Sequence, residues 1–464
     1  MKKILLLCVV LVLFISNVSA QMLQKEQAKA DLKFCYDALK TAHPSLYRYT
    51  KENEFNNIYK FLDARIPDSL PKEEFGELVN ILVSTARCSH TSASNSMKAK
   101  SALVFNFPVV IYKNKLYARS IKEYSTDTNL CRIISINNVP AIEIVDRMMM
   151  LKTGDGFNQN FTEAFFSHNF NTFFNVLYKT PDLCPMVIET DKGKKELQVE
   201  RQKKYTAKYK DYEWDGASTI DTMSGAKLLK LKNIPDTRVL RVKTFKKTNT
   251  VFYKNMFDGL KRDSVKQLVI DLRGNTGGNI NHAFYLLNNI IDKDIYMYTE
   301  RRKAKIAPYL SLKGKAQWML GKLLYDVFPN GQRWNDNNGL KYYRYSYKTK
   351  NLNAYKPHII VLTDGLTVSS GSLVAAYLKY YENAEIIGTE SGGTYTGNNG
   401  RSFPEVVLPN SKINIRLPLF YINYFPGVPN TGKGVAVDAM INPLLDRKSQ
   451  EEVIQNQLLK YVEK

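Results

Sequence analysis

The sequence has few of the residues that hold small or metal-dependent folds together. Its 464 residues include five cysteines and five histidines, and the spacing of the cysteines fits no zinc site. After the first twenty residues it also lacks a long hydrophobic run, which excludes a multi-span membrane protein. A hydrophobic content of 44% and a charged content of 24% exclude a mainly disordered or collagen-like chain. At roughly 150 residues per domain, the length predicts two or three domains.

Acidic residues are also scarce, with 44 Asp and Glu against 66 Lys and Arg and a formal net charge of +22. A balance this basic raises nucleic acid or an anionic surface as a partner. The basic residues are scattered in short clusters such as 192–195 and 301–303, with no zinc-finger or RNA-binding signature. We therefore interpret the charge as a solvated surface and expect no nucleic-acid partner. An envelope protein that binds an anionic polymer is the remaining alternative from charge.

The one long apolar run lies at the N-terminus. Lys2 and Lys3 precede the apolar residues 4–15, and small residues follow up to Ala20. This order is typical of a signal peptide, here residues 1–20, and the run is short for a membrane span. An N-terminal membrane anchor is the alternative. We expect an exported protein, periplasmic or extracellular after cleavage near Ala20, for which contact with a membrane surface is not required.

Four cysteines remain after that cleavage: Cys35, Cys88, Cys131 and Cys184. An even number in an exported chain permits two disulfides. Four buried thiols are an equal alternative, because a chain of this length can form a stable hydrophobic core without disulfide cross-links.

The hydrophobic pattern divides the rest of the chain. Helical spacing dominates 21–100, and strand-like alternation dominates 101–205. Residues 206–235 are polar and are predicted to be a linker. From 236 to 464, strands and helices alternate, which predicts an α/β fold. Within that section, 296–356 is basic and rich in Tyr, and we interpret it as an insertion that forms a lid.

Two turns of the α/β section carry the candidate chemistry. The first, at 271–278, reads Asp-Leu-Arg-Gly-Asn-Thr-Gly-Gly and joins a predicted buried strand to a helix. Glycines let backbone N–H groups approach a ligand, and a helix start leaves N–H donors unpaired, which suits an oxyanion. The Gly-Lys-[Ser/Thr] ending of a phosphate loop is absent. Taken alone, a structural turn explains the segment equally well.

The second turn places three serines, Ser369, Ser370 and Ser372, at the start of a predicted helix. A hydroxyl at a helix N-terminus lies in a positive field that favours a nucleophile. Capping the helix is the commoner role for such a residue. The pattern alone leaves the choice among the three open.

A serine nucleophile needs a base, and the histidines are few. His90 lies in a polar cluster at the end of a predicted helix, and His282 lies just after the glycine turn as the second candidate. We interpret His43, His168 and His358 as structural.

The motifs together resemble those of the C-terminal processing peptidases, also called tail-specific proteases. This serine peptidase family includes the tricorn core protease and the retinoid-binding protein of the retina. The resemblance rests on 271–278, on 367–370, on Gly434 to Asp438 and on the segment 133–139. It implies an α/β, crotonase/ClpP-like protease domain at 236–464, a PDZ-like β-rich domain at 101–205 and a helical part before it.

The resemblance also implies roles for individual residues. Ser369 would be the nucleophile, and an oxyanion hole would come from Gly277 or Gly278 and from Ser370. Many members pair the serine with a lysine about 25 residues later, where this chain has Thr394. The branch like tricorn uses a histidine instead.

In that branch, the histidine has a supporting acid. His90 is similar in placement to the histidine of the branch. Glu390 is the candidate acid, because it lies near the glycine turn that follows the nucleophile segment.

The sequence thus predicts a secreted serine peptidase that acts through a Ser–His acyl-enzyme, without metal or cofactor. Its partner would be a protein or peptide substrate, with the C-terminus as one expected point of capture by the PDZ-like domain. The alternative is a binding protein of the cell envelope that keeps the peptidase fold without catalysis, because fold does not fix function.

Overall fold

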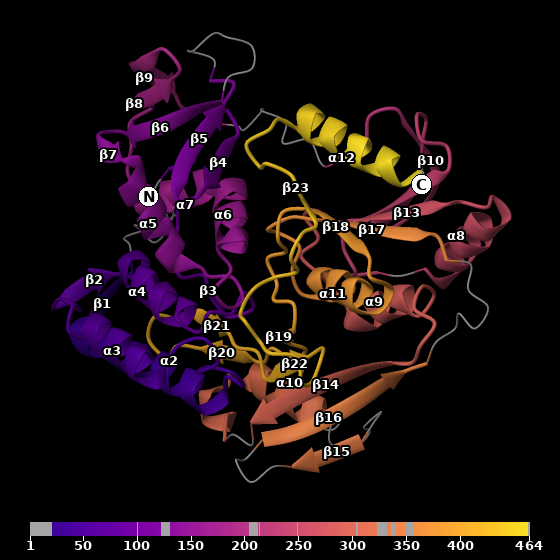
Figure 1. Cartoon of the computed structure of the whole chain (residues 1–464). Helices are drawn as coiled ribbons and strands as arrows, with labels where there is room; N and C mark the ends of the chain where they lie inside the picture. The colour runs from indigo at the N-terminus through magenta and orange to yellow at the C-terminus, as the bar shows by residue number, and fades with distance from the viewer. Residues whose placement is uncertain are drawn as a thin grey trace, which may run out of the picture.

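The computed structural model shows three connected parts (Figure 1). The predicted signal peptide lies outside the residues that it describes. None of the helices in the described ranges is both long and apolar enough to cross a membrane. The described residues are 21–99, 101–121, 130–203, 212, 214–247, 249–302, 305–322, 332–335, 340–348 and 356–462.

Three helices form the N-terminal part: α2 (Lys25–Ala42), α3 (Glu52–Asp63) and α4 (Lys72–Ser84). α2 ends at His43, whose extended backbone is the conformation that a residue before proline favours. α4 begins directly after Pro71, whose fixed φ suits the start of a helix. A short ladder between β1 (Met22–Gln24) and β2 (Ser69–Pro71) joins the start of this part to the start of α4.

The second part is a β-rich unit with a hydrophobic core of its own. Its antiparallel sheet has the order β4-β5-β6-β8-β9, with β7 paired to β6. The strands are β4 (Val109–Tyr112), β5 (Lys115–Arg119), β6 (Leu130–Ile136), β7 (Val139–Pro140), β8 (Leu183–Thr190) and β9 (Gly193–Glu200). The helices that complete it are α5 (Ala141–Leu151), α6 (Gln159–His168) and α7 (Phe170–Leu177). The strands of this unit all lie within 101–205, where the sequence pattern predicts strand-like alternation.

The third part is an α/β structure around a seven-stranded sheet. In spatial order its strands are β10 (Ala217–Met223), β11 (Ala226–Leu231), β12 (Thr237–Val242), β13 (Gln267–Asp271), β17 (His358–Thr363), β18 (Glu385–Gly388) and β23 (Ala439–Met440). The last five run parallel, so their carboxyl ends meet at one edge. α8 (Thr250–Arg262), α9 (Ile280–Leu287) and α11 (Ser370–Glu382) cover one face, and α12 (Arg447–Val462) packs on the other.

The prediction of a linker over 206–235 is wrong for its second half, which contains β10 and β11. β11 pairs with β12 from Ala226 to Lys230, so the hairpin is part of the main sheet. β10 is the edge strand, and most of its side chains are exposed or half-buried. Because it has no apolar face, its sequence has the polarity of a linker.

The proposed insertion at 296–356 also contains regular structure. It contributes most of β14 (Ile295–Arg302), together with β15 (Gln332–Asn335) and β16 (Leu340–Tyr347). These strands continue into β22 (Phe420–Asn423) and β19 (Gly397–Gly400), which makes a second, five-stranded sheet. The 3-10 turn η1 (Ala307–Tyr309) and the helix α10 (Leu312–Lys322) lie between β14 and β15. The described residues of the segment therefore extend a sheet, and the rest of it lies outside the described ranges.

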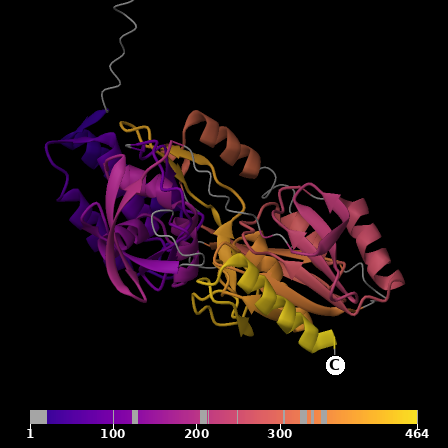
Figure 2. The ribbon, with the colours of Figure 1, turned by 90° about the horizontal axis from the view of Figure 1, so that it is seen from above.

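A small sheet joins the N-terminal and α/β parts. β3 (Ser92–Ser94) pairs with β21 (Asn414–Arg416), which pairs with β20 (Glu405–Val407). Seen from above, the helical and β-rich parts lie on one side and the α/β part on the other (Figure 2). The strand β3 begins two residues after His90, so it holds that histidine against the α/β part.

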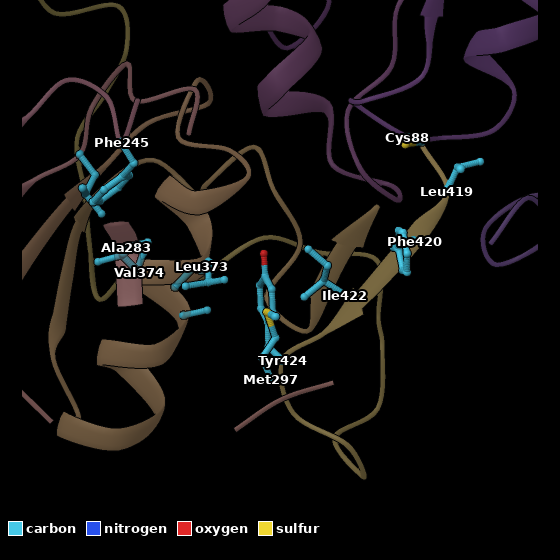
Figure 3. Packing of buried hydrophobic residues seen from close by; sticks show 14 of the residues in the cluster. Cys88, Phe245, Ala283, Met297, Leu373, Val374, Leu419, Phe420, Ile422 and Tyr424 are labelled. Atoms are coloured by element: carbon cyan, nitrogen blue, oxygen red, sulfur yellow. The ribbon is translucent and has the colours of Figure 1, made fainter. Parts of the chain in front are cut away.

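One hydrophobic core runs through both of the joined parts. It includes Cys88 from the N-terminal part, Leu373 from α11 and Ile422 and Tyr424 at β22 (Figure 3). All four cysteines of the described residues are free thiols and buried, so they follow the buried-thiol alternative and form no disulfide. The fold class predicted from the sequence, α/β with helical and β-rich parts, is confirmed.

Candidate active site

Ser369 occupies a strained turn between β17 and α11. Its backbone angles are φ 55° and ψ −126°, a conformation that residues with a side chain rarely adopt. Such strain costs of order 1–3 kcal/mol and persists where the surrounding structure enforces it. A sharp strand-to-helix turn of this kind presents the serine hydroxyl of hydrolases to their substrate.

The hydroxyl groups of the other two serines of the segment, Ser370 and Ser372, both donate hydrogen bonds to backbone carbonyls. Ser370 Oγ donates to the carbonyl oxygen of Gly278 at 3.2 Å, and Ser372 Oγ donates to the carbonyl oxygen of Ser369 at 3.0 Å. Ser369 makes no capping bond with its side chain. The local structure therefore favours Ser369 as the reactive hydroxyl, which the sequence pattern alone could not decide.

The glycine turn lies against Ser369 because it has no side chains there. A Cβ on Gly277 would lie 2.6 Å from Ser369 Cβ, and the φ of Gly277 is 94°. The N–H of Gly277 donates to Asn275 Oδ1 at 2.8 Å, so it is not available to an oxyanion. The N–H groups of Gly278 and Ser370 have no acceptor among the described residues. Of the predicted oxyanion donors, the structure therefore leaves Gly278 and Ser370 free and occupies Gly277.

His90 lies at the end of the loop after α4 and is 8% exposed. Its ring stacks on that of Phe403, with centroids 5.8 Å apart. Its Nδ1 is 3.1 Å from Ser89 Oγ. No partner of Nε2 is found in the described part of the chain, so this nitrogen remains for a ligand or a substrate proton.

A buried carboxylate supports this turn, and it is not the one expected. Asp155 accepts the Ser89 N–H at 2.8 Å and the Ser89 hydroxyl at 2.9 Å. A serine hydroxyl has one proton, and here it goes to Asp155. Ser89 Oγ must then accept from His90 Nδ1–H, which leaves Nε2 unprotonated. This is the tautomer that a general base requires.

Lys152 holds the same turn from the other side. Its Nζ donates to the carbonyl oxygens of Ser89 at 2.5 Å and Thr91 at 3.1 Å. Lys152 and Asp155 both belong to the loop that follows α5 in the β-rich part. That loop therefore contacts both the N–H and carbonyl groups of the His90 turn.

Burial sets the protonation of this cluster. Desolvation, with smaller contributions from Arg416 and Lys152, lowers the pKa of His90 to about 3. Desolvation raises the pKa of Asp155 to about 6 and lowers the pKa of Lys152 to about 8. At neutral pH the histidine is neutral and the carboxylate is ionised, which is the state that a relay from Asp155 through Ser89 to His90 would require.

Cys88 belongs to the same cluster but does not make it a metal centre. Its sulfur, a ring nitrogen of His90 and a carboxylate oxygen of Asp155 all lie within 4.8 Å of one another. Burial raises the pKa of the Cys88 thiol to about 11, so the thiol stays protonated and is a poor ligand. The carboxylate is already used by Ser89. We assign the cluster to holding His90.

A cavity of about 1050 Å³ connects these groups. It is lined by Ser369, His90, Gly277, Gly278 and Ser370, so five of the six site residues predicted from the sequence meet there. Its apolar wall comes from α5, α6 and α7 and includes Leu151, Phe161, Phe165, Phe173 and Val176. No described residue of 296–356 lines it, so the lid hypothesis gains no support.

The sixth predicted residue, Glu390, lies elsewhere. It does not line the cavity, and its Oε1 accepts the N–H of Gly434 at 2.5 Å and the amide of Asn158 at 3.3 Å. It holds the closing segment of the chain, so Asp155 takes its place as the candidate supporting acid. The second candidate base, His282, binds the carbonyl oxygen of Phe245 through Nδ1 at 2.8 Å and does not line the cavity.

Sequence reasoning missed Ser89, Lys152 and Asp155. The segment 152–155 reads Lys-Thr-Gly-Asp directly after an apolar helix. A polar cluster with a glycine at a helix end was a usable signal, of the same kind that selected His90. Nothing in the sequence, however, pairs this segment with 88–91, because the contact is made only in the fold.

Comparisons with known proteins concern the family of the α/β part and the fold of the chain. The model of peptidase family S41 matches residues 236–439. No curated protein sequence matches the chain at a significant level.

Solved structures resemble the chain over nearly its whole length. The structure of mature CPAF complexed with lactacystin has a TM-score of 0.63 and 13% identity, covering 94% of this chain and 98% of that one. A CPAF mutant has a TM-score of 0.65 and 12% identity, covering 94% and 96%. At such identities the likeness concerns the fold alone.

Proposed function

We propose that the chain, whose residues 236–439 match the model of peptidase family S41, hydrolyses peptide bonds through Ser369 and His90. One observation supports the proposal most. The strained Ser369 and the buried His90, far apart in sequence, line one cavity together with two free backbone donors. That combination is what acyl transfer needs.

In the proposed reaction, Ser369 Oγ bonds to the carbonyl carbon of the substrate while its proton passes to His90 Nε2. The N–H groups of Gly278 and Ser370 stabilise the oxyanion, each contributing about 3–4 kcal/mol by analogy with known sites. His90 then gives the proton to the leaving amine, and water hydrolyses the acyl-enzyme by the same route. Asp155, through Ser89, stabilises the imidazolium that forms.

The cellular setting is a further part of the proposal. We propose that residues 1–20 direct export, so that the peptidase acts in the periplasm or outside the cell. The β-rich part would act as a PDZ-like module that captures an extended segment or the C-terminus of a protein substrate. The apolar wall that α5, α6 and α7 give the cavity supports a contribution of this part to substrate binding.

A catalytically inactive binding protein is the second candidate. The observation that favours it is that His90 contacts a hydroxyl, Ser89, and reaches a carboxylate only through it. A relay of this kind is weaker than a direct carboxylate contact.

A fluorophosphonate probe separates the two. The mature protein should be labelled, and Ser369→Ala should abolish labelling. Ser370→Ala and Ser372→Ala are matched controls that remove neighbouring hydroxyls and should retain most of it. If the folded wild type is not labelled and cleaves no peptide, the peptidase proposal fails. A His90→Ala variant with full cleavage would remove His90 from the mechanism.

A further inference from the structure

The charges around the cavity all have one sign. The described residues that line it include no Asp or Glu, and they include four cations: Lys152, Lys246, Arg401 and Arg416. Such a cavity raises the local concentration of anionic substrates and repels cationic ones. Lys152 already donates to two backbone carbonyls, so it serves the fold.

Arg416 is placed differently from the buried Lys152. It ends β21, its side chain is exposed to solvent, and its guanidinium carbon lies 4.0 Å from the centre of the Phe403 ring. In the described part of the chain, its side chain has neither a carboxylate partner nor a hydrogen bond. Because the Phe403 ring packs against one face of the guanidinium, the orientation of the N–H groups is restricted, and these groups remain available to an acceptor.

The nearest acidic residue in the ladder does not neutralise it. Glu405 is directly opposite Arg416 in the pairing of β20 with β21. Its carboxylate instead accepts the Ser311 hydroxyl at 2.7 Å and lies 3.8 Å from Lys313 Nζ. Glu405 therefore lies opposite Arg416 in the ladder, but its carboxylate contacts Ser311 and Lys313 instead of the guanidinium.

Arg416 is close to the reacting groups. Phe403 contacts both Arg416, at 4.0 Å, and the His90 ring, at 5.8 Å between centroids. The guanidinium is thus no farther from His90 than the sum of those two distances. An extended peptide advances about 3.3 Å per residue, so that span corresponds to roughly three residues.

We propose that Arg416 determines specificity by binding a substrate carboxylate within about three residues of the scissile bond. The inference rests on the proposed peptidase function and names the substrate class of the same cavity: acidic peptides or peptides ending near the cut. Arg binds a carboxylate with two parallel hydrogen bonds, which gives geometric selection as well as charge. An acidic side chain and a terminal α-carboxylate offer the same chemistry.

The test compares peptides that differ by one charge. Glu and Gln versions of one peptide are made at each of three positions on either side of the cleaved bond, with free and amidated C-termini. The wild type should cleave one Glu peptide, or the free-ended peptide, about 10–100-fold faster in kcat/KM than its neutral partner. In Arg416→Gln this ratio should fall to about 1. Because the ratio is internal to each variant, a general loss of activity or folding does not change it.

Two variants and one binding assay complete the design. Lys412→Gln removes a charge from the turn of the same hairpin and should keep the wild-type ratio. Among the described residues, Lys412 Nζ binds only the carbonyl oxygen of Pro409. Arg416→Lys keeps the charge without the planar fork and should give an intermediate ratio. If the wild type prefers Glu over Gln at one position of the peptide, Arg416 binds an acidic side chain. If it prefers only the peptides with a free C-terminus, Arg416 binds the α-carboxylate.

Binding to the inactive Ser369→Ala variant, measured by fluorescence anisotropy, separates the two proposals. If no peptide is cleaved but the charged peptide binds Ser369→Ala more tightly than the neutral one, the peptidase proposal fails and the Arg416 site stands. Equal cleavage and equal binding of charged and neutral peptides by the wild type would overturn the Arg416 site.

Discussion

At the scale of single residues, the site depends on the absence of a side chain at Gly277. Replacing Gly277 with Ala would put a Cβ 2.6 Å from Ser369 Cβ and force alanine to a φ of 94°. Gly427→Ala is a matched control, because its φ is 91° and its Cβ would meet nothing within 4 Å. Both variants should lose about 1–2 kcal/mol of unfolding free energy from backbone strain.

Only Gly277→Ala should also lose fluorophosphonate labelling, by at least about 100-fold, because Ser369 must move. Labelling rates and chemical denaturation measure the two effects separately. Equal labelling of both variants would show that the contact with Ser369 does not matter for reactivity.

Motif reading and structure agree on some residues and differ on others. His90, Gly278 and Ser370 belong to short polar or glycine-rich patterns in the local sequence, whereas the choice of Ser369 among three serines needed the family resemblance. Of the two alternative donors Gly277 and Gly278, Gly277 is excluded because its N–H donates to Asn275 Oδ1, a bond that only the folded turn shows.

At the scale of elements, the loop after α5 controls the protonation of the site. The pKa of Asp155 is raised to about 6 by burial, whereas that of His90 is lowered to about 3. The acid limb of kcat/KM should therefore lie near pH 6 and belong to Asp155. Below that pH the protonated carboxyl has an O–H that can donate to Ser89 Oγ, which favours the wrong tautomer of His90, and activity should fall. A pH profile of peptide cleavage from 4.5 to 9 measures it.

Asp155→Asn tests the assignment, because an amide NH₂ would donate to Ser89 and favour the wrong tautomer of His90. Activity should fall by about 10²–10⁴-fold, and the acid limb of kcat/KM near pH 6 should disappear.

The effect of Asp155 on stability changes with pH in the opposite direction to its effect on activity. A buried Asp with a raised pKa stabilises the fold below its unfolded pKa of 3.8, and that contribution is lost as pH rises through about 6. At pH 8, Asp155→Asn should thus be no less stable than the wild type. If Asp155→Asn kept the acid limb of kcat/KM near pH 6, that limb would belong to another titratable group.

Helices and strands with a strong hydrophobic periodicity could be predicted from the sequence. Elements whose conformation depends on the strands or loops beside them could not. β13, β17, α11 and the strand pairs of the β-rich part follow from hydrophobic periodicity. β10 did not, because an edge strand with solvent on most sides has no apolar face to recognise. The pairing of the α5 loop with the His90 turn joins segments that no local signal relates.

At the scale of the whole molecule, the N-terminal helices share one hydrophobic core with the α/β part. The β-rich part has a separate core. The sequence predicted the three parts but not this difference, because shared burial depends on which apolar faces meet after folding. His90 is anchored in the shared core through its neighbour Cys88, so the position of the base depends on the stability of the α/β part.

The shared core predicts which substitutions reach the main sheet. Leu39 in α2 and Leu116 in β5 are both almost fully buried, the first in the shared core and the second in the β-rich core. Each Leu→Ala change should cost about 2–5 kcal/mol locally. Hydrogen exchange at β13 should accelerate strongly in Leu39→Ala and little in Leu116→Ala, because opening of the β-rich core leaves the main sheet intact. Equal acceleration at β13 in both variants would mean that the three parts unfold as one unit, and no change in Leu39→Ala would mean that the N-terminal helices open without the α/β part.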